Sequence, residues 1–72
     1  MTIQENAKFT VENVVSDYNF EDRKHGSVYY NYTYWEILAM IKHAYEIGAF
    51  SEGNARRYCY QMHCTFEEMM SA

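Results

Sequence analysis

Apolar residues in the middle of the chain recur every three or four positions, which is the spacing of one face of an α-helix. Thr33 and Glu36 precede this stripe with the spacing of a capping box, in which each side chain bonds the other residue's backbone amide. Gly48 follows it as a residue suited to a helix end. The sequence therefore predicts a helix over 34–47, whose inner positions are Tyr34, Ile37, Leu38, Ile41, Ala44 and Tyr45.

A second apolar stripe follows after a short connection and predicts a helix over 52–70 with Ser51 as its N-cap. Thr65 and Glu68 form another possible capping box within this range. The alternative is therefore a helix that ends earlier and restarts at Thr65. The stripe consists of Ala55, Tyr58, Cys59, Met62, Phe66, Met69 and Met70.

The first thirty residues carry a weaker pattern. Val11, Val14, Val15 and Tyr18 fit a helix near 10–20 that begins at Thr10, and residues 1–8 are expected to form a flexible N-terminus. Residues 27–33 have strong β propensity and could pair within a short β-hairpin over 17–33. We expect a mainly α fold with a single compact domain over 9–72, and an α+β fold that contains this hairpin is the alternative.

With 72 residues, the chain has room for only a small hydrophobic core. Cys59 and Cys64 would diverge by about 140° on one helix, which does not suit a disulfide. Self-association into a homo-oligomer is therefore the expected additional source of stability. The N-terminus lacks the pattern of a signal peptide, and no apolar run is long enough for a membrane span, so a cytoplasmic protein without membrane contact is expected.

Candidate chemistry is sparse in this sequence. His43, Cys59, His63 and Cys64 lack the short turn spacings of zinc modules, and none of these cysteines comes with a recognisable third catalytic group. We therefore expect no metal, no cofactor and no enzymatic activity. The net charge of −4 disfavours broad binding to a phosphate backbone and suits a basic protein partner.

Aromatic residues are the most informative feature, because eight tyrosines and one tryptophan exceed what so small a core can enclose. Tyrosine and tryptophan are enriched in protein interfaces. We expect a small acidic interaction protein that binds a larger protein, with an inhibitor of a host nucleic-acid-handling protein, encoded by a phage or mobile element, as the sharper hypothesis. The predicted contact residues are Tyr29, Tyr30, Tyr32 and Trp35, with Glu36 and Asp22 as charges at the rim.

A nucleic-acid-binding regulator is the alternative function. Two helices joined by a short turn have the outline of a helix-turn-helix motif, in which residues early in the second helix contact the bases. Arg56, Arg57 and Tyr60 lie there in this sequence. The acidic balance of the chain makes DNA or RNA the less favoured partner.

Overall fold

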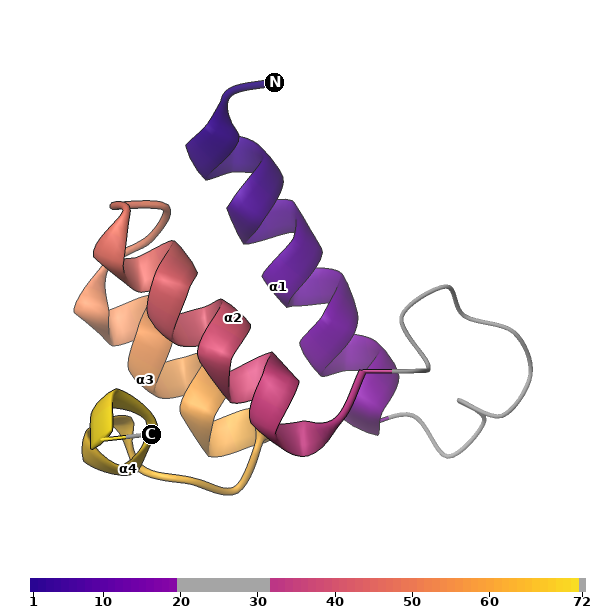
Figure 1. Ribbon diagram of the computed structural model, residues 1–72, viewed down its shortest axis with the longest axis vertical. Helices are drawn as coiled ribbons and strands as arrows, with labels where there is room; N and C mark the ends of the chain where they lie inside the picture. Colours follow the sequence, from indigo (N-terminus) through magenta and orange to yellow (C-terminus); the bar gives the residue numbers. More distant parts are fainter. Residues whose placement is uncertain (20–31, 72) are drawn as a thin grey trace.

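The computed structural model describes residues 1–19 and 32–71, and these residues form four α-helices without a β-strand (Figure 1). The mainly α fold is thus confirmed. Residues 17–19 of the hairpin alternative belong to the first helix, and its segment 20–31 lies outside the described residues. The helices are α1 (Ile3–Asn19), α2 (Tyr34–Glu46), α3 (Glu52–Gln61) and α4 (Phe66–Ser71).

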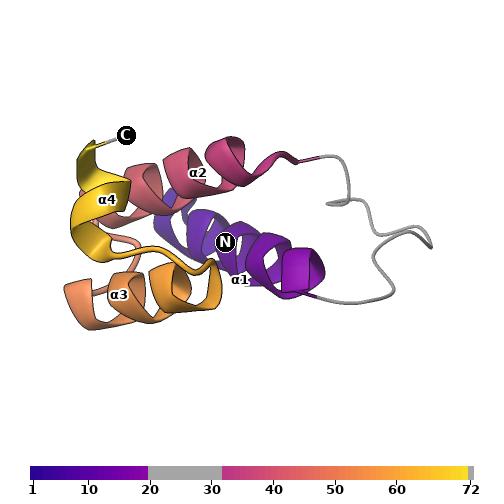
Figure 2. The same cartoon turned by 90° about the horizontal axis from the view of Figure 1, so that it is seen from below.

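Helices α1 and α4 each pack against both α2 and α3, so the core lies between these four elements (Figure 2). A tertiary hydrogen bond adds to this packing, because the Tyr58 hydroxyl on α3 donates to a Glu12 carboxylate oxygen on α1 at 3.0 Å. None of the described helices is long and apolar enough to cross a bilayer. The buried core consists of Val11, Val14, Val15, Ile37, Leu38, Ile41, Ala44, Phe50, Ala55, Tyr58, Cys59, Met62 and Met69.

Helix α1 begins at Ile3, so the predicted start near Thr10 is wrong. Thr2 and Glu5 form a capping box: each backbone amide donates to the other side chain at 3.0 Å. Thr10 is an interior residue whose hydroxyl donates to the Asn6 carbonyl at 2.9 Å. The helix therefore includes residues 3–8, which the apolar pattern had left outside it.

Helix α2 matches its prediction closely. Thr33 is its N-cap and forms both bonds of the capping box with Glu36, and Ile47 is its C-cap. Gly48 follows in the left-handed region at φ 81°, where glycine has no steric penalty. The amides of Gly48 and Ala49 donate to carbonyls of Tyr45 and Ala44, which is the bonding pattern of a Schellman motif.

The predicted helix 52–70 is two helices, and the restart at Thr65 is confirmed. Helix α3 ends at the C-cap Met62, and His63 turns the chain with φ 60°. The amides of His63 and Cys64 donate to the carbonyls of Tyr60 and Cys59, each at 3.0 Å, in a second Schellman motif. Thr65 and Glu68 then exchange the two bonds of a capping box, which starts α4.

Candidate protein-binding surface

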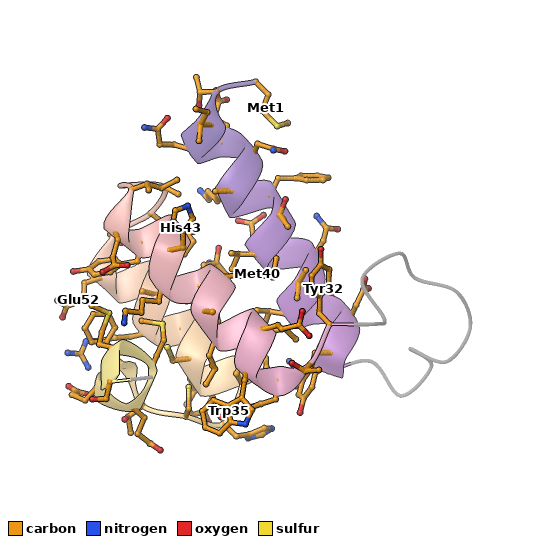
Figure 3. The ribbon with its side chains drawn as sticks, in the orientation of Figure 1. Met1, Tyr32, Trp35, Met40, His43 and Glu52 are labelled. Carbon is orange, nitrogen blue, oxygen red and sulfur yellow. The ribbon has the colours of Figure 1, made fainter. Side chains whose placement is uncertain are left out.

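Trp35 is the large aromatic side chain that α2 presents to solvent, with 68% of its surface exposed. It lies in the first turn of the helix, one residue after Tyr34, and the two rings meet edge to face with centroids 5.3 Å apart. Tyr34 is itself half-buried and lies against Tyr18 of α1, with ring centroids 6.1 Å apart. The indole therefore contacts one packed ring, that of Tyr34, while most of its own surface stays accessible at the edge of the molecule (Figure 3).

Two open hollows adjoin the Trp35 side chain, and Trp35 lines both of them. One has a volume of about 420 Å³ along the outer side of α2, and the other about 380 Å³ between α2 and the α4 region. We call Trp35 together with these linings the Trp35 surface. The first hollow is completed by Ala39, Lys42, His43 and Glu46, and the second by Tyr34, Leu38, Cys64, Glu68 and Ser71.

Three carboxylates lie next to Trp35 in the sequence or along the two hollows that it lines. Glu36 is the next residue and is exposed, Glu46 lines the first hollow, and Glu68 lines the second. Lys42 and His43 add basic groups within the first hollow. The Trp35 surface thus combines an apolar projection with a mixed but predominantly acidic border, which is the composition of an interface centre with a polar rim.

The structure brings together only part of the predicted contact set. Trp35 and Glu36 are consecutive residues in the first turn of α2, whereas Tyr32 precedes the helix, is 38% exposed and lies apart from Trp35 (Figure 3). Asp22, Tyr29 and Tyr30 lie outside the described residues.

The sequence analysis did not assign the outer side of α2 to the site. A signal was present, because Ala39, His43 and Glu46 follow Trp35 at intervals of four, eight and eleven residues, which share one side of a helix. This stripe contains a single aromatic residue, so a search for clustered rings does not find it.

The alternative nucleic-acid surface is largely engaged within the chain. Arg56 forms ion pairs with Glu52 at 2.9 Å and Glu67 at 3.3 Å, and its guanidinium lies 4.7 Å from the centre of the Phe66 ring. The hydrogen bond to Glu52 and the nearby Glu67 raise the pKa of Arg56. A phosphate would have to compete with two carboxylates for this guanidinium.

The other two residues of that surface are less constrained by ion pairs. Arg57 lies over the Tyr58 ring, with its guanidinium carbon 5.4 Å from the ring centre. Tyr60 is 81% exposed, more than Trp35, but none of the residues lining the two hollows comes from its helix. Tyr60 is therefore an exposed ring outside the Trp35 surface, which makes it a matched control for Trp35.

The thiol and imidazole groups differ in how far they are exposed to solvent. Cys59 is completely buried, and burial is the main reason that its pKa is raised to about 12. His43 and His63 are both exposed. Residues 1–19 and 32–71 contain no group of three histidine, cysteine or acidic side chains that could hold a metal ion.

No protein-family model matches this chain, and comparisons with curated proteins and with solved structures found no similar protein.

Proposed function

We propose that this protein is a non-enzymatic interaction protein that binds a larger protein through the Trp35 surface. The exposure of Trp35 is the observation that carries this proposal, since 68% of the one tryptophan in the chain faces solvent. Tryptophan is among the residues most enriched at the energetic centres of interfaces. The edge-to-face contact with Tyr34 restricts the indole before binding, and such preorganisation reduces the conformational freedom lost in a complex.

The charges around the indole indicate the chemistry of the partner. Glu36, Glu46 and Glu68 border the Trp35 surface, and the chain as a whole carries a net charge of −4. Complementary charge steers association and selects partners. The proposed partner therefore offers an apolar pocket for the indole within a basic border. Nucleic-acid-handling proteins carry basic surfaces, and inhibition of such a protein is the sharper form of the proposal.

Affinity capture with three baits tests the placement of the surface. The wild-type chain, Trp35→Ala and Tyr60→Ala are used in parallel, and retained proteins are identified by mass spectrometry. A partner retained by wild type and Tyr60→Ala but lost with Trp35→Ala supports the proposal. Equal retention by Trp35→Ala contradicts it. Both substituted rings are mostly exposed, so both variants are expected to keep the fold.

Fluorescence provides a direct measurement once a candidate partner is purified. Because Trp35 is the one tryptophan of the chain, its emission reports on this site alone. We expect the emission of a solvent-exposed indole in the isolated protein and a shift to shorter wavelength when a tryptophan-free segment of the partner covers it. Unchanged emission in a verified complex would place the interface elsewhere.

The nucleic-acid alternative has its own test. An Arg56→Ala, Arg57→Ala double variant removes the basic groups that it requires, and an electrophoretic shift assay at low salt measures binding to mixed DNA and RNA. Salt-sensitive binding that the double variant abolishes would favour this alternative.

Self-association also stays a prediction, and light scattering measures it.

A further inference from the structure

Cys59 and Cys64 occupy two related positions of the Schellman motif that ends α3. With Met62 as the C-cap, Cys59 is the third residue before the end of the helix and Cys64 is the second residue beyond its C-cap. Side chains at these two positions commonly contact each other in this motif. The expectation that the two thiols diverge assumed one continuous helix. Because the helix ends between them, that assumption is wrong.

The backbone bond of the motif limits the separation of the two residues. The Cys64 amide donates to the Cys59 carbonyl oxygen at 3.0 Å. Adding the covalent spans at either end of this bond limits the Cα separation to at most about 6.9 Å. Disulfides usually join Cα atoms about 4.4–6.8 Å apart. The side chains also interact, because the Cys64 thiol contributes, after burial, to raising the pKa of Cys59.

The two thiols differ in their access to solvent. Cys64 is half-buried and lines the hollow between α2 and the α4 region, so it is the cysteine that a small molecule in that hollow meets. Cys59 has 0% of its surface exposed. An oxidant therefore meets Cys64 first, and Cys59 is placed to react with the product.

We propose that Cys59 and Cys64 form a reversible intramolecular disulfide, with a peroxide as the oxidant and Cys64 as the sulfur attacked first. The Cys64 thiolate attacks one peroxide oxygen and the O–O bond breaks. A sulfenic acid remains on Cys64, and the departing hydroxide takes up the proton that the Cys64 thiol had lost and becomes water. Cys59 sulfur then displaces this hydroxyl group, and water leaves with the proton of the Cys59 thiol. In total, two thiols and one hydrogen peroxide give one disulfide and two waters, and a dithiol reductant reverses the change.

Disulfide formation also changes a contact inside the core. The Cys59 thiol lies 3.5 Å from the Met69 sulfur of α4, in a weak hydrogen bond that the disulfide removes. Oxidation would therefore join the end of α3 to the connection before α4 while it loosens one contact between the helices. Cys64 also belongs to the Trp35 surface, but the disulfide is measured in the isolated chain without a partner, so the two proposals can fail separately.

Intact mass spectrometry of the full chain after treatment with hydrogen peroxide tests the proposal. We expect a monomer that has lost two hydrogens, which dithiothreitol restores, and a peptide map that joins Cys59 to Cys64 and separately assigns oxygen added to methionines such as the exposed Met1. Cys64→Ser and Cys59→Ala should both lack this loss, and Cys59→Ala should instead gain oxygen at Cys64. Wild-type protein that gains oxygen without losing hydrogens, or that links only between chains, would overturn the proposal.

A second measurement needs no variant and separates the folded geometry from mere nearness in sequence. The wild-type chain is equilibrated with a glutathione redox buffer, both folded and in denaturant, and the fraction of disulfide is measured. If the fold favours the bond, its equilibrium constant should be larger in the folded state by roughly tenfold or more. An equal or smaller constant in the folded state would overturn the proposal.

Discussion

The connections α2–α3 and α3–α4 have the same construction but differ at the residue that turns the chain. Each begins with a Schellman motif and ends with a hydroxyl N-cap, Ser51 in the first and Thr65 in the second. Gly48 adopts the left-handed conformation in the first connection, whereas His63 adopts it in the second. Glycine adopts this conformation without steric strain, whereas a residue with a Cβ is strained in it. The two connections thus share one backbone geometry, but only the second adopts it with local conformational strain.

The helices that follow also differ in how they are held. Helix α3 has ten residues, and Phe50 before it is buried against the Tyr58 ring, with centroids 4.9 Å apart. Helix α4 has six residues, too few to be stable alone. It depends on its capping box and on Met69, which is fully buried. We conclude that the α3–α4 connection depends on the tertiary packing of α4, whereas the α2–α3 connection is favoured by the conformational preference of Gly48.

The largest effect is expected from removing that packing. Met69→Ala should lower the free energy of unfolding by about 3 kcal/mol, because it leaves a cavity where α4 meets the core. Urea denaturation measures the change. Met70→Ala is the matched control, since Met70 is only half-buried, and its effect should be clearly smaller. Equal effects of the two variants would contradict the assignment of Met69 as the anchor of α4.

A smaller loss is expected at the first connection. Gly48→Ala places a Cβ at φ 81° with no other atom within 4 Å, so its cost comes from backbone conformation rather than collision. We expect a loss of about 1 kcal/mol in the free energy of unfolding after the reduced entropy of the unfolded chain is taken into account.

Gly53→Ala is the control for this substitution, because Gly53 lies in the first turn of α3 and its Cβ would meet Ser51 Oγ at an ordinary 3.7 Å. That variant should stabilise the protein by about 0.5 kcal/mol or more, as alanine favours helix over glycine. A loss of stability in both variants would indicate that backbone conformation does not decide whether a glycine-to-alanine substitution raises or lowers the free energy of unfolding.

The smallest change in the free energy of unfolding is expected when the α3–α4 connection receives glycine, the residue that turns the chain in the α2–α3 connection. His63→Gly should raise the free energy of unfolding by about 0.5 kcal/mol, since relief of the left-handed conformation exceeds the entropy that glycine adds to the unfolded chain. His63→Ala keeps the strained conformation and should change stability little. Thermal unfolding of the three proteins side by side distinguishes these outcomes, and a gain with alanine equal to that with glycine would contradict the interpretation.

Local sequence signals predicted the helices better than apolar spacing did. The pairs Thr33–Glu36 and Thr65–Glu68 identified two helix starts that the structure confirms. The same pattern at Thr2–Glu5 was overlooked because the next two turns of α1 contribute no buried side chain, and Ile3 and Phe9 are exposed. Apolar spacing reports only the part of a helix that faces the core.

Other features depend on information that no local pattern contains. Histidine is a weaker signal for a left-handed helix end than glycine, so the turn at His63 depends on the tertiary packing that buries Met69 in the next helix. The exposure of Trp35 was expected from the apolar face of α2, which excludes it. The two hollows next to Trp35 were not expected from the sequence. The second includes residues from the α4 region, whose position is set only by tertiary packing.

The capping bonds at the helix starts have a consequence for folding kinetics. Thr2, Thr33, Ser51 and Thr65 each bond an amide three residues later, so the first turn of every described helix can form before any distant contact exists. Nucleation is the slow step of helix formation, and domains dominated by local contacts fold within microseconds to milliseconds. We therefore expect this chain to refold in roughly a millisecond or less, from a denatured ensemble in which these first turns already form transiently.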